Sequence, residues 1–298
     1  MRRILVLRGG ALGDLIVTLP ALALLRRRWP EAHIALIGNT TAARLALTRG
    51  LISELRSQHD GRWAPLHDTA PLPTSLSEWL AAFDLVVNFW PDPDGALRRH
   101  FPTHPGQSFI EAAALPPPGH GPAAFHYQAS LAPLGLPTGT LIYPLATQGP
   151  ARRDGAGIFI HAGSGSVLKN WPLANWLRVA RELPTTPTFI LGEAEIARWD
   201  AAGEATAGFA TLRNQTLEEL ITELSGCRLF LGHDSGISHL AAGCGARCVL
   251  LFGPTDPATW APPSPQVRVL KAAAGLSALS PESVLAAAQA HFADQRSG

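Results

Sequence analysis

Short runs of Val, Ile, Leu and Phe alternate along this chain with stretches in which hydrophobic positions recur at helical spacing. Runs of this kind bounded by Gly, Pro, Asn and Asp are typical of buried strands, and strands alternating with helices predict βαβ units and parallel sheets. In the first half we expect strands at Ile4–Leu7, His33–Ile37 and Leu85–Asn88, and a helix from Leu15 to Trp29.

The pattern restarts in the second half with a buried strand at Gly157–Ile160. Further strands are expected at Thr188–Leu191, Arg228–Leu231 and Cys248–Phe252, and helices from Pro172 and over Leu217–Leu224, Ser235–Ala242 and Pro281–His291. The proline-rich segments Pro116–Gly119 and Pro144–Gly155 cannot form central strands or helix interiors. We therefore expect two α/β domains, residues 1–150 and 151–298, with the last helix free to pack back on the first domain.

Composition excludes several classes of protein. The 298 residues include 24 basic and 23 acidic ones, so bulk charge gives the chain no affinity for nucleic acid. We expect no signal peptide, because strand-like residues begin at Ile4, and no membrane span. Cys227, Cys244 and Cys248 form no CxxC pair, which indicates free thiols and a cytoplasmic protein.

The first loop of chemical interest, Arg8 to Asp14, follows the first strand, where open α/β sheets place their ligands. Gly10 and Gly13 permit a tight turn and close approach of a ligand, but Arg8 stands where the dinucleotide fingerprint requires glycine. Asp14 lies near a helix N-terminus. It is either a helix cap, which contributes about 1 kcal/mol, or a base that accepts a proton from a bound hydroxyl.

The second loop runs from Gly163 to Pro172 and has the composition of a phosphate cradle. Small residues expose backbone N–H groups, and Ser164, Ser166 and Lys169 add two hydroxyls and an ammonium. It is not a Walker A loop, because Leu168 precedes the lysine. The alternative is a surface turn with a solvated lysine. Lys169 and Lys271 are the only lysines among the 24 basic residues, which favours a specific role for Lys169.

The third loop, Gly232 to His239, lies between a strand and a helix. Ser235 and the N–H of Gly236 would point from a helix N-terminus and form a second anion site. Asp234 can accept from hydroxyls, and His239 lies one turn into the helix on the face of Ser235. Alternatively, Asp234 or Ser235 caps the helix and His239 is a buried core histidine.

Taken together, these loops resemble the heptosyltransferase family of bacterial glycosyltransferases. The resemblance includes Leu19–Leu22, Leu25-Arg26, Leu251–Pro257 and Trp260, and spans nearly the whole chain. It implies a GT-B architecture of two Rossmann-like α/β domains facing across a cleft, with the acceptor on the N-terminal domain and the nucleotide sugar on the C-terminal one. His233, where the family often carries asparagine, and the proline-rich middle depart from the pattern and bear on sugar and acceptor identity.

The resemblance also implies roles for single residues. Asp14 matches the general base, in an acceptor-side loop with Gly10 and Gly13. A glutamate that binds the ribose falls in Gly192–Glu195, where Glu195 is preferred and Glu193 stays open. The residues that match the donor site are Ser164, Gly165, Ser166 and Lys169 for the pyrophosphate, and Asp234, Ser235, Gly236 and His239 for the sugar and phosphates.

The implied activity is inverting, metal-independent transfer of a sugar, expected to be heptose from ADP-heptose, to a lipopolysaccharide-core or related glycan acceptor, without a cofactor. One carboxylate in the Asp14 loop fits direct displacement, whereas retention would require a nucleophilic carboxylate near an acid, by analogy with glycosidases. Two alternatives remain: a nucleotide-sugar epimerase on the same fold, and a non-catalytic nucleotide-sugar-binding protein.

Two charged groups have competing interpretations. Asp92-Pro93-Asp94 resembles the D-x-D metal site of the other glycosyltransferase fold, but its position between Pro91 and Gly95 favours a solvated turn, and we expect no metal. The run Arg26–Arg28 fits the last turn of a helix, where it complements the helix dipole. It could also contact an anionic, lipid-linked acceptor at the inner membrane face.

Overall fold

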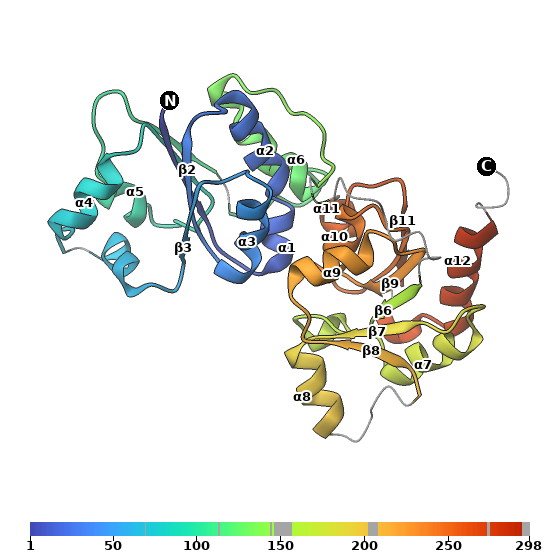
Figure 1. The fold of residues 1–298 in the computed structure, drawn as a ribbon. Helices are drawn as coiled ribbons and strands as arrows, with labels where there is room; N and C mark the ends of the chain where they lie inside the picture. The colour runs from blue at the N-terminus through green and yellow to red at the C-terminus, as the bar shows by residue number, and fades with distance from the viewer. Residues whose placement is uncertain are drawn as a thin grey trace. The chain divides into compact units, whose positions relative to one another are not determined.

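The computed structural model describes residues 1–68, 70–112, 114–143, 145, 157–201, 208–272 and 275–293. The chain forms two compact units, Met1–Pro144 and Leu145–Gly298, each built on its own parallel sheet (Figure 1). The predicted α/β class with parallel sheets is confirmed. The predicted irregular segment Pro116–Gly119 is irregular, whereas Pro144–Gly155 lies, apart from Leu145, outside the described residues.

The first unit has a five-stranded sheet in the order β3-β2-β1-β4-β5. Its strands are β1 (Arg3–Arg8), β2 (His33–Gly38), β3 (Glu54–Ser57), β4 (Leu85–Asn88) and β5 (Ser108–Glu111). The sheet grows from β1 through β2 to β3 on one side and through β4 to β5 on the other. The strand order therefore reverses between β1 and β4, and open α/β sheets bind ligands outside the carboxyl ends of the strands at such a reversal.

Helices cover this sheet and close its core. The described helices are α1 (Leu12–Ile16), α2 (Leu19–Arg28), α3 (Thr40–Thr48), α4 (Thr74–Ala81), α5 (Ala96–His100), α6 (Ala123–Ala129) and the 3₁₀ helices η1 (Gly61–His67) and η2 (Ala132–Leu134). On one face, the side chains of Leu5, Ile37 and Val86 pack with Trp63 of η1 and Phe83. The helices on both faces explain why the central strands are apolar on both sides.

The structure corrects the expectation of a single helix from Leu15 to Trp29. The chain instead forms two helices, α1 and α2, which are separated by Val17 and Thr18. Pro20 has no N–H to continue the helical ladder. In addition, the Thr18 hydroxyl donates to the carbonyl of Asp14 at 2.8 Å, and the Arg8 guanidinium donates to the same oxygen at 2.9 Å. These side chains occupy an acceptor that a continuous helix would use.

The second unit has a six-stranded sheet in the order β11-β10-β9-β6-β7-β8, again with its first strand in the middle. Its strands are β6 (Ile158–His161), β7 (Thr188–Leu191), β8 (Ala210–Arg213), β9 (Leu229–His233), β10 (Cys248–Phe252) and β11 (Val267–Lys271). The order reverses between β6 and β9, so the loops that follow these two strands lie at the expected ligand edge.

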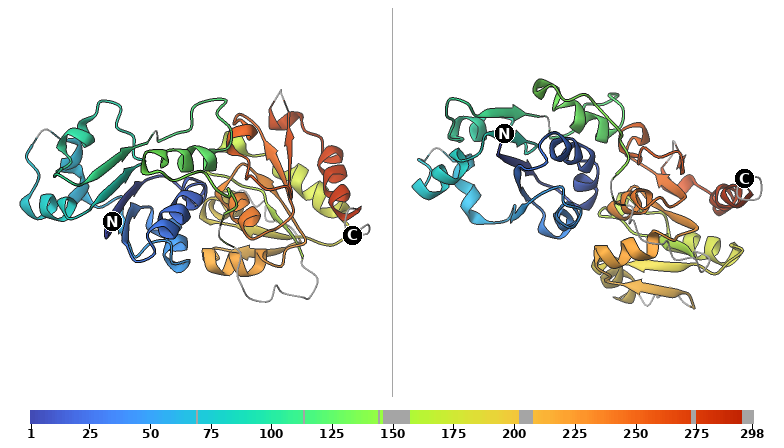
Figure 2. Two further views of the ribbon diagram at one scale, coloured as in Figure 1. Left: turned by 90° about the horizontal axis from the view of Figure 1, so that it is seen from above. Right: turned by 45° about the horizontal axis from the view of Figure 1, so that its top comes forward.

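The helices of this unit are α7 (Leu173–Glu182), α8 (Glu193–Ala201), α9 (Leu217–Leu224), α10 (Gly236–Gly243), α11 (Pro257–Trp260) and α12 (Pro281–Ala293), with 3₁₀ helices η3 (Val167–Lys169) and η4 (Leu276–Ala278). Helix α12 lies beside α7 and against β9 and β10 (Figure 2), and buries Val284 and Ala288 in the core that Trp171 and Trp176 share. Within the described residues, no helix combines the length and the apolar character that crossing a membrane requires.

Candidate functional site

In the first unit, the loop after β1 places Asp14 in the first turn of α1. The helix begins at Leu12 with Ala11 as its cap, so Asp14 is the third helical residue and not the cap. Its Oδ2 atom accepts the N–H of Ala11 at 2.9 Å. Gly10 has a φ of 100°, and a Cβ there would lie 2.5 Å from Oδ2 of Asp14. Glycine at position 10 therefore leaves the space that this carboxylate occupies.

Arg8 anchors this carboxylate from the protein side. Its buried guanidinium lies 3.4 Å from Oδ1 of Asp14, while the Asp14 side chain is 33% exposed. Arg8 also donates to the hydroxyls of Thr18 at 2.9 Å and Tyr127 at 3.0 Å, and burial raises the pKa of Tyr127. Gly13 lies within α1. The result is an anchored carboxylate that stays accessible, as a base must be.

In the second unit, the loop after β6 is organised by Ser164. The buried hydroxyl of Ser164 lies 2.8 Å from the carbonyl of Ser166 and 2.6 Å from Oδ1 of Asn170, and it accepts the N–H of Ser166 at 3.3 Å. Gly165 is exposed, and a Cβ there would meet open space. Nδ2 of Asn170 is a buried donor without a hydrogen-bond partner. The loop therefore offers backbone and side-chain donors of the kind that bind phosphate.

Lys169 joins this loop to the one after β9. Its Nζ atom donates to Oδ2 of Asp234 at 2.7 Å, and the hydroxyl of Thr255 donates to the same oxygen at 2.7 Å. The Asp234 side chain is 9% exposed and the Lys169 side chain 30% exposed. Lys169 is therefore not a solvated surface lysine, because a buried carboxylate holds its ammonium at the edge of the sheet.

Helix α10 begins beside this ion pair. Ser235 is its cap and accepts the N–H of Ser238 at 3.3 Å, and Gly236 is its first helical residue. The first N–H groups of a helix have no intrahelical partner and favour anions. His239 lies inside α10 and is buried. The structure thus brings Asp234, Ser235 and Gly236 together with Lys169.

Glu195 reaches the site from the loop after β7 and the first turn of α8. Its side chain is 7% exposed, whereas Glu193 is exposed. The carboxylate accepts the N–H of Gly192 at 2.9 Å and lies 3.8 Å from Nε2 of His161. Burial raises the pKa of Glu195, but the His161 ring and the Gly192 N–H outweigh it and lower the pKa below its usual value. A Cβ on Gly163 would lie 1.9 Å from Oε1 of Glu195, so glycine is needed there.

His233, the last residue of β9, is a fixed and fully buried acceptor. Its Nε2 atom accepts the backbone N–H of Trp171 at 2.8 Å and the indole N–H of Trp176 at 3.2 Å. The proton must then be on Nδ1, which faces the carbonyl of Gly163 at 3.4 Å. Burial, aided by the neighbouring His161, lowers the pKa of His233 to about 3. His233 therefore supports the Gly163 loop as a neutral ring.

Asp92, Asp94 and Arg26, for which the sequence left two interpretations, form hydrogen bonds with nearby backbone groups. The carboxylate of Asp92 accepts the N–H groups of Leu97 and Arg98, and that of Asp94 accepts the N–H of Ala96, so both serve the start of α5. Arg26 donates to carbonyls just beyond the end of α2, while Arg27 and Arg28 are exposed. Within the described ranges, no group of three His, Cys, Asp or Glu residues could hold a metal.

Sequence reasoning missed three supporting residues. In the sequence, Arg8 is a departure from a glycine motif and Arg8 and Thr255 lie in stretches that resemble the family, but the contacts of Arg8, His161 and Thr255 with the site carboxylates are not predicted. All three lie at or just after the carboxyl ends of the strands β1, β6 and β10. Their position at the ligand edge is the signal that could have found them.

Comparison with known proteins supports the same interpretation. Residues 144–282 match the model of glycosyltransferase family 9 (heptosyltransferase), which confirms the predicted resemblance for this part of the chain. Lipopolysaccharide heptosyltransferase 1 of Pseudomonas aeruginosa is 33% identical over 104 residues, which are 34% of this chain. They are 29% of that relative, so the chain covers less than a third of its length.

Solved structures are similar over nearly the whole chain. The family 9 glycosyl transferase of Veillonella parvula is 21% identical with a TM-score of 0.76, covering 98% of both chains. The Escherichia coli heptosyltransferase WaaC with ADP is 18% identical with a TM-score of 0.72, covering 97% of this chain and 99% of the other. At identities this low, the structural similarity is evidence for the fold alone. It confirms the predicted GT-B architecture of two Rossmann-like domains.

Proposed function

We propose that this chain, whose residues 144–282 match the model of glycosyltransferase family 9 (heptosyltransferase), transfers heptose from ADP-heptose to a lipopolysaccharide-core or related glycan acceptor. The observation that carries the proposal is the ion pair of Lys169 and Asp234, 2.7 Å apart where the loops after β6 and β9 meet. A cation held beside a helix N-terminus and a Gly/Ser loop suits a departing diphosphate.

In this proposal, the second unit binds the donor. Lys169, the Ser164 loop and the first N–H groups of α10 stabilise the charge that develops on the nucleoside diphosphate as it leaves. Asp234 holds Lys169 and can accept from sugar hydroxyls, and Glu195 accepts from the ribose. The neutral His233 ring keeps the Gly163 backbone in place through its contact at 3.4 Å.

The first unit supplies the base. The Asp14 carboxylate accepts the proton of the acceptor hydroxyl, the hydroxyl oxygen bonds to the anomeric carbon, and the bond from that carbon to the diphosphate oxygen breaks with its electrons. Arg8 keeps the carboxylate oriented, with 3.4 Å between the charged groups. Displacement in one step inverts the anomeric centre, and in this proposal it requires neither a metal ion nor a cofactor.

We place the reaction on the cytoplasmic side, with peripheral contact at the inner membrane.

The test is transfer itself, with purified protein, ADP-heptose and a heptose-deficient lipopolysaccharide core as acceptor, in the presence and absence of EDTA. The proposal expects acceptor-dependent release of ADP and an inverted product, unchanged by EDTA. Conversion of the nucleotide sugar without acceptor would instead identify an epimerase. Donor binding without either reaction would identify a binding protein.

A further inference from the structure

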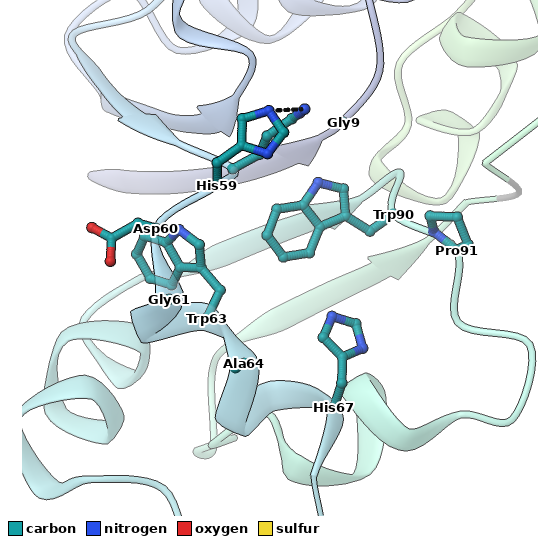
Figure 3. Close-up of a pocket in the computed structure, with 10 residues that line it drawn as sticks. Gly9, His59, Asp60, Gly61, Trp63, Ala64, His67, Trp90 and Pro91 are labelled. Carbon is teal, nitrogen blue, oxygen red and sulfur yellow. Dashed lines mark hydrogen bonds between the residues drawn. The ribbon is translucent and has the colours of Figure 1, made fainter.

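His161, the last residue of β6, is a buried titratable group to which the proposed function gives no task. It differs in this from the pocket of about 510 Å³ in the first unit (Figure 3). That pocket is lined by Gly9, which continues into the loop that carries Asp14, so it belongs to the acceptor side of the proposed site. His161 lies in the second unit, among the residues proposed to bind the donor.

The position of His161 in the sheet lets its ring reach two loops. Strand β6 pairs with β7 on one side and with β9 on the other, and His161 stands at its carboxyl end, opposite Gly232 of β9. The Nε2 atom lies 3.8 Å from Oε2 of Glu195, in the first turn of the helix that follows β7. The Nδ1 atom lies 3.4 Å from Oγ of Ser235, the cap of the helix that follows β9. The ring therefore lies between the residue proposed for the ribose and the helix start proposed for the diphosphate.

The charge of Glu195 decides which nitrogen of the His161 ring faces it with a proton. Burial raises the pKa of the Glu195 carboxyl, but the His161 ring and the N–H of Gly192 lower it overall, which favours the ionised form. An ionised carboxylate only accepts hydrogen bonds, so Nε2 carries a proton, and Nδ1 of the neutral ring can accept from the Ser235 hydroxyl. At 3.8 Å the contact with Glu195 is electrostatic, longer than a hydrogen bond. It is strengthened by burial, because both side chains are 7% exposed.

The two oxygens of Glu195 are in different surroundings. Oε2 accepts the N–H of Gly192 at 2.9 Å and is the oxygen that faces His161. Oε1 packs against the backbone of Gly163, where a Cβ would lie only 1.9 Å away. The carboxylate is therefore confined by two glycines, and the His161 ring supplies the positive edge that orients it. With Oε2 held in this way, Oε1 is the oxygen that can turn to a ligand hydroxyl.

We infer that His161 is a positioning residue for the donor, whose ring holds the Glu195 carboxylate in the orientation in which it accepts from the ribose hydroxyls, and steadies the Ser235 cap beside it. That Glu195 binds the ribose rests on the proposed function. The ring acts through its neighbours and has no need to touch the ligand. Histidine suits this role because its two nitrogens lie on opposite edges of one rigid ring, so that one side chain serves both loops.

Two amide substitutions separate the two nitrogens of the ring. His161→Asn places its amide near the position of Nδ1 and leaves Glu195 without its contact, whereas His161→Gln extends the amide to the position of Nε2. Glu195→Gln removes the charge of the carboxylate, and a double variant combines it with His161→Asn. The matched control is Glu193→Gln, because Glu193 is exposed in the same helical turn.

The ligands are ADP and 2′,3′-dideoxy-ADP, which differ only in the ribose hydroxyls. The ratio of their dissociation constants, measured by isothermal titration calorimetry on the full chain, isolates the contribution of these hydroxyls. In the wild type we expect dideoxy-ADP to bind about tenfold more weakly than ADP or weaker still, as for hydrogen bonds to a charged group.

The ratio should fall roughly fivefold or more in His161→Asn and in Glu195→Gln, and stay within about twofold of the wild type in His161→Gln and Glu193→Gln. The double variant should have the ratio of Glu195→Gln alone. A residue that acts on the ribose only through Glu195 has no further effect once the carboxylate is gone, and two residues that act independently would instead add their effects.

A purely structural role for His161 predicts a different result. His161→Asn would then weaken ADP and dideoxy-ADP equally and leave the ratio unchanged, which overturns the inference. A ratio near one in the wild type also overturns it, because Glu195 then does not bind the ribose.

The wild-type chain offers a check that needs no variant to fold. ADP should shift the nitrogen NMR signal of Nε2 in His161 more than dideoxy-ADP does, and equal shifts overturn the inference. Transfer of heptose, measured on the same protein, reports separately on the proposed function. A chain with the expected ratios that transfers no heptose would contradict the proposed reaction and leave the inference intact.

Discussion

The Nζ atom of Lys169 lies 2.7 Å from Oδ2 of Asp234, across 65 residues of sequence. The pair joins the loops after β6 and β9 at the reversal of strand order, and Thr255 donates to the same carboxylate oxygen. A lysine ammonium held in this way is poised to contact an anion without being buried itself, because its side chain remains 30% exposed. In the proposed function, binding of the donor diphosphate depends on this contact.

Lys169→Ala should therefore weaken ADP binding by about 1.5–3 kcal/mol, the range for a charge-assisted hydrogen bond, or roughly ten- to 150-fold. Isothermal titration calorimetry measures it. The matched control is Lys271→Ala. This second lysine is 45% exposed, and its nearest carboxylate, that of Asp256, is 4.0 Å away and also exposed, so its ammonium is not held in the way that Lys169 is. Equal affinity of the Lys169 and Lys271 variants would remove Lys169 from the phosphate site.

The close approach of Glu195 to Gly163 predicts a second effect. A Cβ at position 163 would lie 1.9 Å from Oε1 of Glu195, so Gly163→Ala must displace the carboxylate or the loop. We expect a loss of about 1–3 kcal/mol in the free energy of unfolding, as for other overpacked sites, together with weaker ADP binding.

Chemical denaturation of Gly163→Ala and Gly165→Ala makes the comparison within one loop. A Cβ at position 165 meets no atom within 4 Å, so this second variant should unfold like the wild type. Equal stability of the two variants would show that Glu195 is free to move away and is not fixed against Gly163.

The buried His233 makes stability depend on pH. Its pKa is about 3 in the folded chain, compared with about 6.5 in the unfolded chain. Between these values the unfolded state binds more protons, so the stability that is fully present above pH 6.5 is lost as the pH falls toward 3, by at most about 1.4 kcal/mol per pH unit.

His233→Asn removes this titration while keeping a side-chain acceptor. Denaturant unfolding at pH 7, 6, 5 and 4 should show a shallower decline for the variant than for the wild type, although the variant is less stable at pH 7 because the contacts to Trp171 and Trp176 are altered. Parallel declines would mean that His233 is not the group responsible.

The sequence predicts the central strands well, because each is a short apolar run closed by glycine or a polar residue. It does not reveal β3, β5, β8 and β11, which lie at the edges of their sheets and contain charged residues. Half-exposed edge strands have no continuous apolar run to recognise. The break before α2 is not predicted for another reason, since besides Pro20 it depends on the hydrogen bonds that Thr18 and Arg8 donate to the carbonyl of Asp14, and the bond from Arg8 is tertiary.

The loops of the candidate site could be located from sequence, but not the geometry within them. The difference in burial between Glu193 and Glu195 cannot be predicted from the sequence, because it arises from their positions on different faces of the first turn of α8. The position of Asp14 as third helical residue depends on where α1 begins.

The central claim is that Asp14 is the base, and its structure makes a clean substitution possible. The Oδ2 atom of Asp14 serves the helix start by accepting the N–H of Ala11. The amide oxygen of asparagine can keep that hydrogen bond but cannot take a proton from the acceptor. Asp14→Asn should therefore keep the start of α1, and the loss of the charged contact with Arg8 should lower the free energy of unfolding by no more than about 1–2 kcal/mol.

The most direct measurement is the turnover of Asp14→Asn with saturating ADP-heptose and acceptor, beside its affinity for ADP. The account predicts that turnover falls by about 10²- to 10⁴-fold, the usual contribution of a general base, while ADP affinity stays within a factor of two. Turnover within a few-fold of the wild type, with ADP affinity intact, would show that Asp14 only supports the start of α1 and would contradict the proposed mechanism.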